Sequence, residues 1–304
     1  MKVAITGATG FVGSRLVEKL VSQGDQPLIF SRNGAKASRL FPKLEIVTYT
    51  PKESGDWQKA IAGCDAVVNL AGAPIAESRW TPERKQEILG SRKLGTQRIV
   101  EAIAMAEPKP EVLVNASAVG YYGTSETATF DENSPPSDDF LAQVCQAWEG
   151  EAEKVKEAGV RLVILRFGIV LGEGGGALAK MLTPFKMFAG GPLGSGRQWF
   201  SWIHREDLVN LIIAAIQRKD MEGVFNATAP NPVRMSELCQ NLGDVLNRPS
   251  WLPVPDFALE AMLGEGAMVV LEGQQVLPKR TTDYGFEYQY PTVKPALKEI
   301  VSSR

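Results

Sequence analysis

Cysteine and histidine are scarce in this sequence. Its 304 residues include three cysteines and one histidine. The cysteines, Cys64, Cys145 and Cys239, are far apart and form no CxxC pair, so the sequence predicts neither a disulfide framework nor a metal site. An odd number of widely spaced thiols is typical of a protein from a reducing compartment.

Long hydrophobic runs and an excess of one charge are also missing. No apolar segment approaches the roughly 20 residues that a helix needs to cross a bilayer. The opening MKVAIT lacks the basic segment, apolar stretch and cleavage site of a signal peptide. The 33 basic and 35 acidic residues nearly balance and form no Lys/Arg block. We therefore predict a cytoplasmic protein that binds neither membrane nor nucleic acid; the expected partner is a small-molecule substrate, and a homodimer is one assembly that the sequence allows.

The sequence does contain a regular alternation of short β-rich runs with longer helical segments. The expected strands are residues 3–6, 27–31, 44–48, 66–70, 112–116, 160–166 and 223–227. The expected helices are residues 10–22, 82–106, 137–157 and 206–216. Because most of these strands are apolar throughout, we expect helices on both of their faces. The predicted fold class is therefore α/β, with a doubly wound parallel sheet.

After Arg166 the composition shifts toward glycine and proline, in segments such as GEGGGALAKM, GGPLGSGRQW and RPSWLPVPD. We assign a larger, sheet-containing core to residues 1–172, joined by about 198–230. A smaller C-terminal substrate lobe is assigned to residues 173–197 and 231–304. The GGGALAKML run lacks the GK[ST] ending of a phosphate-binding P-loop, so we interpret it as a flexible lid or hinge over the cleft between the lobes.

A GxxGxxG pattern, TGATGFVG at residues 6–13, joins the first expected strand to the first expected helix. In this context Gly7 permits a tight turn, Gly10 lets the backbone approach a pyrophosphate, and Gly13 allows the helix to pack closely on the strand. The helix N-terminus attracts the anion. An ordinary strand-to-helix turn is the alternative, which the position after the first strand disfavours. The pattern thus predicts a Rossmann fold, with cofactor contacts from Gly7, Thr9, Gly10, Phe11, Val12 and Gly13.

The end of the second expected strand favours NADP(H) over NAD(H). An NAD-selective site usually presents Asp or Glu there to the adenosine ribose hydroxyls. This sequence has LIFSRNGAK, with Ser31 and Arg32 in that place. A guanidinium beside a hydroxyl suits a 2′-phosphate in charge and in hydrogen-bond geometry. An arginine solvated on a loop is the alternative interpretation.

Several motifs resemble those of extended short-chain dehydrogenase/reductases: TGATGFVG at 6–13, NLAG at 69–72 and LRFGIVLG at 165–172. Further segments resemble one branch of the NAD-dependent epimerase/dehydratase superfamily, the atypical "epimerase family proteins", also labelled nucleoside-diphosphate-sugar epimerases. These segments are RWTPERKQEILGSR (79–92), GGPLGSGRQWFSWIHREDL (190–208) and VLPKRTTDYGFEY (276–288). The resemblance covers nearly the whole chain.

The resemblance implies further cofactor contacts beyond the glycine turn. They are Leu70, Ala71, Gly72, Glu87, Arg92 and Val170. Taken without the resemblance, Glu87 and Arg92 would be interpreted as solvated charges on a helix.

The catalytic pair of this superfamily is missing from the sequence. Its members use a Tyr, activated by a Lys four residues later, to give or take a proton. With Glu149 as the anchor of the alignment, these two positions fall on Leu141 and Cys145, and neither side chain does that work. We interpret Cys145 as a core residue.

Two other residues remain as catalytic candidates in NASAVGYYG, residues 115–123. The resemblance aligns Ser117 with the active-site serine and Tyr122 with the tyrosine of a VYG motif. The ends of parallel strands line the ligand crevice of such sheets, which favours a site role. Capping of a turn by Ser117 and packing of Tyr122 are the alternatives. The sole histidine, His204, is expected to be a packed structural residue.

The leading functional hypothesis is an NADP(H)-dependent oxidoreductase or epimerase-like enzyme with an atypical active site. Its substrate is expected to be a small carbonyl or hydroxyl compound, or a nucleotide sugar. The rival hypothesis is a non-catalytic NADP(H)-binding sensor or scaffold that kept the fold and lost the Tyr/Lys pair.

Overall fold

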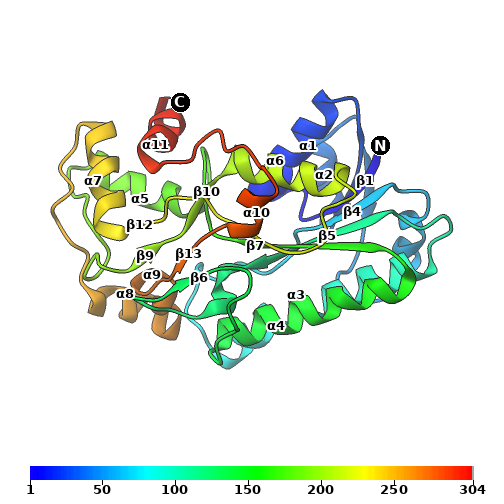
Figure 1. Cartoon of the computed structure of the whole chain (residues 1–304), viewed down its shortest axis with the longest axis horizontal. Helices are drawn as coiled ribbons and strands as arrows, with labels where there is room; N and C mark the ends of the chain where they lie inside the picture. The colour runs from blue at the N-terminus through cyan, green and yellow to red at the C-terminus, as the bar shows by residue number, and fades with distance from the viewer. Residues whose placement is uncertain (303–304) are drawn as a thin grey trace.

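The central sheet has seven strands, each parallel to its neighbours, in a computed structural model that describes residues 1–302 (Figure 1). The strands span Lys2–Thr6 (β1), Gln26–Ser31 (β2), Glu45–Thr48 (β3), Ala66–Asn69 (β4), Val112–Ala118 (β5), Arg161–Phe167 (β7) and Gly223–Ala227 (β11). Their order is β3-β2-β1-β4-β5-β7-β11, so the winding reverses between β1 and β4. Ligands of such sheets bind at this reversal, outside the carboxyl ends of the strands.

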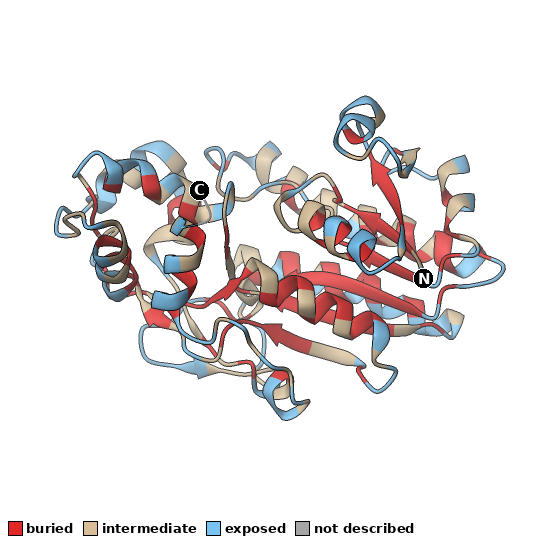
Figure 2. Ribbon diagram, turned by 90° about the horizontal axis from the view of Figure 1, so that it is seen from above, coloured by how far each residue is buried: buried red, intermediate tan, exposed pale blue. Residues whose placement is uncertain are grey.

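Helices cover both faces of the sheet, as the two-sided apolar strands predict. They span Phe11–Ser22 (α1), Gly34–Leu40 (α2), Pro82–Met105 (α3), Phe140–Glu153 (α4) and Arg205–Gln217 (α6). Successive residues of β1 point to opposite sides, since Val3 and Ile5 join the core beneath α1 and α6 whereas Ala4 joins the core beneath α3. The strands of the sheet are accordingly mostly buried, except for the edge strand β3 (Figure 2). The predicted doubly wound α/β fold is confirmed.

Local capping sets the ends of the long helices on the α3/α4 face. Thr81 accepts a hydrogen bond from the Arg84 amide at 3.2 Å, and Pro82 opens α3. Asp139 caps α4 in the same way, so this helix begins three residues after the predicted Ser137. It is also shorter than predicted at its other end, where a 3₁₀ turn (η3, Lys154–Ala158) leads into the left-handed Gly159.

The smaller lobe has its own apolar core. Its elements are β8 (Ile169–Leu171), α5 (Gly176–Lys186), β9 (Trp199–Phe200), β10 (Trp202–His204), β12 (Val233–Arg234), α7 (Met235–Leu246) and α11 (Val293–Ser302). Three of them, β8, β9 and β10, lie in the ranges that the sequence assigns to the larger core, but they contribute side chains to the core of this lobe. Strand β8 pairs with β10, and β9 pairs with β12. The fully buried Trp202 lies in this core together with side chains of α5, α7 and α11.

The remaining elements are short and lie between those already described along the chain. They are η1 (Asp56–Ile61), η2 (Val119–Tyr122), β6 (Thr129–Phe130), α8 (Asp256–Leu263), η4 (Gly264–Ala267), α9 (Met268–Leu271), β13 (Gln275–Val276) and α10 (Lys279–Asp283). The chain returns to the sheet at α10, where Arg280 donates to the Val224 and Glu222 carbonyls at 2.6 and 2.9 Å. Within residues 1–302, no helix combines the length and apolarity required to cross a bilayer.

Candidate functional site

A cleft of about 570 Å³ lies at the carboxyl ends of the central strands. One side is formed by the β1–α1 turn and by the ends of β4, β5 and β7. The other side is formed by α4, by residues 199–201 and by the segment 268–274, which ends just before β13. The cleft therefore occupies the crevice where a doubly wound sheet binds its ligands.

The glycine turn has the geometry that the sequence pattern predicts. Gly7 has a φ of +71°, and a Cβ atom there would lie 2.9 Å from the carbonyl carbon of Leu70. A Cβ atom on Gly13 would lie 2.3 Å from the Gly7 carbonyl oxygen. The Gly10 amide donates to that same oxygen at 2.9 Å. Side chains at Gly7 and Gly13 are thus excluded by backbone atoms.

The residues of this turn suit the pyrophosphate of a dinucleotide. No side chain caps the N-terminus of α1, so its first amides are available to an anion. Gly7, Gly10, Phe11, Val12 and Gly13 all line the cleft, whereas Thr9 does not. A close backbone approach and free helix-terminal donors are what a phosphate group requires.

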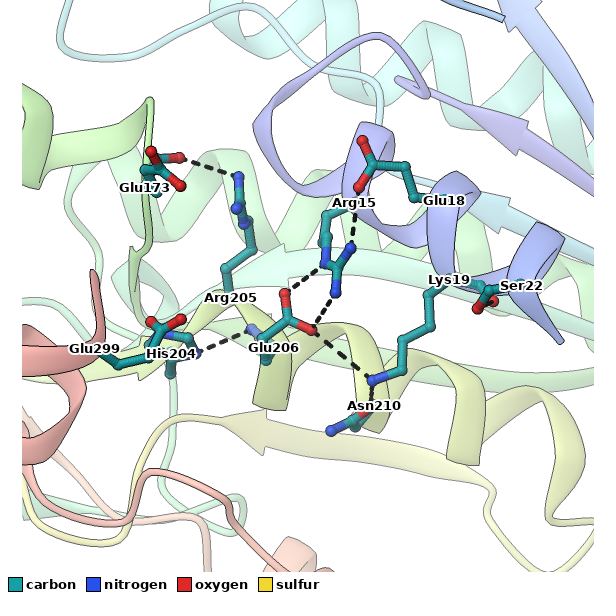
Figure 3. A network of polar contacts seen from close by, with 10 residues as sticks. All are labelled: Arg15, Glu18, Lys19, Ser22, Glu173, His204, Arg205, Glu206, Asn210 and Glu299. Atoms are coloured by element: carbon teal, nitrogen blue, oxygen red, sulfur yellow. Dashed lines mark hydrogen bonds and ion pairs between the residues drawn. The ribbon is translucent and has the colours of Figure 1, made fainter. Parts of the chain in front are cut away.

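The glycine run after β8 packs around the ring of Phe11. A Cβ atom on Gly175 would lie 2.5 Å from the Phe11 ring, and one on Gly172 would lie 3.0 Å from it. The Arg205 guanidinium lies over the ring, 4.8 Å from its centre. Arg205 also donates to the Glu173 carbonyl (Figure 3). The run predicted as a lid or hinge is therefore in contact with the predicted cofactor turn.

Polar contacts fix α1 against α6, as Figure 3 shows. Arg15 donates to both carboxylate oxygens of Glu206, at 2.6 and 3.0 Å, and Lys19 donates to Asn210. His204 caps α6 by accepting the Glu206 amide. The imidazole is 2% exposed, and burial lowers the pKa of His204. The structure thus gives His204 the packed structural role that the sequence predicts, and in addition the N-cap of α6.

The residues predicted to select NADP(H) stand at the end of β2, one strand outward from β1. Ser31 is buried, and its hydroxyl bonds the backbone of Asn33. Arg32 is exposed, and neither residue lines the cleft. Their contact with a 2′-phosphate stays a prediction.

The β4 end and α3 contribute only some of the contacts that the resemblance implies. Leu70 and Gly72 line the cleft, whereas Ala71 does not. The Leu70 and Ala71 amides both donate to the Thr6 hydroxyl at 3.2 Å, so they point into the protein instead of toward a ligand. From the smaller lobe, Val170 lines the cleft as predicted.

Arg92 and Glu87 face different directions. Five residues advance a helix by about 140°, so the two side chains leave α3 in different directions. Arg92 lines the cleft, donates to the Ala73 carbonyl at 3.0 Å and stacks on Trp148. Burial lowers the pKa of Arg92, and in the described chain it has no acidic partner. Glu87 does not line the cleft and pairs with Lys52 at 2.5 Å, and its contact with the cofactor stays a prediction.

Ser117 connects the cleft with a buried charge pair. It lines the cleft at the end of β5, and its hydroxyl donates to Glu149 of α4 at 2.6 Å. Arg166 of β7 donates to both oxygens of the same carboxylate, each at 2.8 Å. The Glu149 and Arg166 side chains are only 10% and 4% exposed. Only the Ser117 hydroxyl therefore separates the Glu149 carboxylate from the cleft.

Tyr122, the second predicted catalytic residue, lies outside the cleft. It is 3% exposed, accepts a hydrogen bond from Arg166 at 2.9 Å and donates to Asn226 at 2.7 Å. Burial raises the pKa of Tyr122 to about 12. The prediction is corrected because the 3₁₀ turn after β5 directs this side chain into the protein, where its hydroxyl is fully used.

The face of α4 toward the cleft is apolar. Leu141, Val144, Cys145 and Trp148, at helical spacing, all line the cleft. The positions aligned with the missing Tyr and Lys therefore do face the site, and they carry Leu141 and Cys145. Burial raises the pKa of the Cys145 thiol to about 11, so it is not a nucleophile at neutral pH.

Several residues of the site were not predicted from the sequence. Glu149 served only as an alignment anchor, Arg166 only as the end of a strand, and the segment 268–274 had no assigned role. One signal was available, since a charged residue at the end of the apolar run RLVILRF needs a buried partner. The identity of that partner was not readable from the sequence.

Comparisons with known proteins cover the whole chain. Residues 3–227 match the NAD dependent epimerase/dehydratase family, and residues 254–300 match a Domain of unknown function (DUF1731). The chain is 55% identical to the chloroplastic epimerase family protein SDR39U1 homolog of Arabidopsis thaliana, over 99% of this chain and 87% of that protein. It is 40% identical to epimerase family protein YfhF of Bacillus subtilis, over 100% and 99% of the two chains.

A crystal structure of human epimerase family protein SDR39U1 (isoform 2) with NADPH is also similar. It has a TM-score of 0.90 and 37% identity, with all of both chains covered. NADPH is the cofactor type predicted here from Ser31 and Arg32. The family match over most of the chain and these full-length relatives lead to one conclusion: this chain belongs to the NAD dependent epimerase/dehydratase family, among its epimerase family proteins.

Proposed function

We propose that this chain is an NADP(H)-binding oxidoreductase or epimerase-like enzyme that acts on a small carbonyl or hydroxyl compound or on a nucleotide sugar. One observation carries the proposal: a glycine turn suited to an anion and the Ser117–Glu149–Arg166 network open onto the same cleft. The NADPH of the human relative supports the choice of cofactor.

The cofactor would be held by the residues of the turn and by its neighbours. The first amides of α1 bind the pyrophosphate, Ser31 and Arg32 bind the 2′-phosphate, and Leu70, Gly72, Arg92 and Val170 contact the remainder. Bound NADP(H) supplies hydride transfer. The protein must then hold the substrate and move one proton.

Ser117 and Glu149 form the proton path. Because the Ser117 hydroxyl donates to Glu149, its oxygen is left to accept a hydrogen bond from a substrate hydroxyl. As that substrate is oxidised, its proton passes to Ser117 Oγ while the serine proton passes to Glu149. Reduction of a carbonyl runs the same transfers in reverse. Arg166 balances the charge of the buried carboxylate.

Substitution of Ser117 by alanine tests this path. Turnover of NADPH with a panel of aldehydes, ketones and nucleotide sugars is expected to fall by roughly 100-fold or more, because the proton path is cut. The Kd for NADPH should not change. If wild-type protein binds NADPH tightly and turns over none of the panel, the sensor hypothesis is favoured instead.

The matched variant Tyr122→Phe should behave in the opposite way. Removing this buried hydroxyl leaves Asn226 and Arg166 short of a partner, so unfolding free energy should fall by about 1–3 kcal/mol. Turnover per folded molecule should stay at the wild-type value. Urea denaturation and the same NADPH assay measure the two effects, and a loss of turnover would restore Tyr122 as a catalytic residue.

Substitution of Arg32 tests whether the protein prefers NADP(H) to NAD(H). Arg32→Ala is expected to raise the Kd for NADPH about tenfold, the value of one exposed charge-assisted hydrogen bond. The Kd for NADH should stay constant. Arg39→Ala, an exposed arginine at the end of α2, is the control and should change neither value. Equal affinities of all variants for both cofactors would contradict the assignment.

A further inference from the structure

Positive charge is nearly absent from the cleft. Among the described residues that line it, only Arg92, Asp139 and Glu272 are charged. Arg92 lies on the side of the glycine turn, next to Gly72, where the cofactor is expected. A substrate beside the cofactor therefore meets no lysine or second arginine on the cleft wall.

The two acids of the cleft also disfavour an anionic substrate. Asp139 Oδ1 accepts the Ala142 amide at 3.0 Å as the cap of α4. Glu272 Oε2 accepts the Thr124 hydroxyl at 2.6 Å across the cleft wall. A nucleoside diphosphate brings at least two negative charges, which proteins usually meet with Arg, Lys or free backbone amides. Here it would meet carboxylates.

Cations near this region are held by other groups. Lys180 donates to the Ala76 carbonyl at 2.9 Å, and Lys85 forms an ion pair with Glu265. Arg234 stacks on Trp199, 3.8 Å from its ring centre, and donates to the Glu126 carbonyl at 2.9 Å. None of these three cations lines the cleft. These three cations are therefore held in positions where they do not supply the positive charge that the cleft wall lacks.

The walls instead present mainly apolar surface. The α4 face described above lies on one side, and Met268 and Val269 lie on the segment 268–274. The Ser117 hydroxyl, at the end of β5, is the polar group that the proposed function assigns to a substrate oxygen. The cleft thus suits an apolar body that carries one carbonyl or hydroxyl oxygen.

We propose that the substrate is an uncharged carbonyl or alcohol compound with an aliphatic or aromatic body, and not a nucleoside-diphosphate sugar. The inference rests on the proposed function, which it narrows to one class of substrate. Specificity comes from burial of the apolar body against α4 and Met268. No charged group of the cleft takes part.

The test is calorimetric titration of the NADPH-loaded protein with 2-alkanones from 2-butanone to 2-nonanone, and separately with UDP-glucose and UDP. Each added methylene is expected to tighten binding about fourfold until the cleft is filled, from roughly 0.8 kcal/mol per buried methylene. UDP-glucose and UDP should give no binding at millimolar concentration. NADPH oxidation with the same compounds follows turnover.

Two methionine variants test whether the alkanone chain binds against Met268. Met268→Lys should weaken binding of the longest alkanone about tenfold or more, because a charge replaces part of the apolar wall. The Kd for NADPH should stay the same. Met262→Lys, at a side chain that is 69% exposed on α8, is the matched control and should change neither affinity.

The outcomes separate this proposal from the proposed function. The proposed substrate class is overturned if UDP-glucose binds more tightly than 2-nonanone. It is also overturned if the alkanones do not bind, or if their affinity does not depend on chain length. If NADPH itself fails to bind, the proposed function is wrong. Chain-length-dependent binding of alkanones without turnover supports the substrate class and contradicts the enzymatic role.

Discussion

Gly13→Ala is expected to raise the Kd for NADPH by about 100-fold or more. The new Cβ atom would lie 2.3 Å from the Gly7 carbonyl oxygen and 2.7 Å from Ala8 Cα, both backbone atoms that have little room to move. The turn must then shift away from the phosphate position. Loss of two charge-assisted hydrogen bonds at about 1.5–3 kcal/mol each corresponds to a weakening of this size.

Isothermal titration with NADPH measures the effect, and thermal unfolding shows whether the variant is folded. The clash itself should also destabilise the protein, by about 1–3 kcal/mol. Gly90→Ala, within α3, is the control, because nothing lies within 4 Å of its added Cβ atom. Gly90→Ala should leave the Kd for NADPH unchanged and raise the free energy of unfolding by roughly 0.5–1 kcal/mol. A folded Gly13→Ala protein with wild-type affinity would remove the glycine turn from the site.

Glu149→Gln should have the second large effect, on both stability and turnover. The amide keeps the shape of the carboxylate but leaves Arg166, whose side chain is 4% exposed, as an uncompensated buried charge. Removing one partner of such a pair costs about 3–5 kcal/mol. Turnover should fall by about 10²–10⁴-fold, because an amide does not take the proton from Ser117. The Kd for NADPH should be unchanged.

The control for Glu149 lies on the same helix. Glu151→Gln breaks a pair with the half-exposed Lys154 and does not touch Ser117, so its losses should be small. Combining Glu149→Gln with Ser117→Ala separates catalysis from folding. If the two residues share one proton path, the double variant should be no slower than the slower single variant. A purely structural Glu149 would lower stability and leave turnover per folded molecule intact.

Patterns that are local in the sequence gave correct predictions. Each predicted strand of the sheet is present to within two residues at either end, because alternation and apolar runs are properties of neighbouring residues. The same holds for the glycine turn, whose constraint is a backbone conformation within seven residues. The substitution of the Tyr and Lys positions by Leu141 and Cys145 was also visible, and both side chains do face the cleft.

Predictions that depended on side-chain direction were less successful. Glu87 and Arg92 were assigned together, and of the two only Arg92 lines the cleft, because a five-residue separation turns them to different faces of α3. Tyr122 was assigned from a motif, but its hydroxyl is taken by Asn226 and Arg166. A motif specifies the type and the position of a residue. The groups that hydrogen-bond to its side chain lie on other helices and strands, which the motif does not include.

The sequence by itself determined the doubly wound sheet, the glycine turn and the loss of the usual catalytic pair. The tertiary structure alone decided that Ser117, Glu149 and Arg166, from β5, α4 and β7, meet at one point, and that the cleft wall carries so little positive charge. The physical reason is that turns and strand patterns depend on adjacent residues. Burial, charge pairing and the shape of a cleft depend on the packing of segments that are distant in the chain.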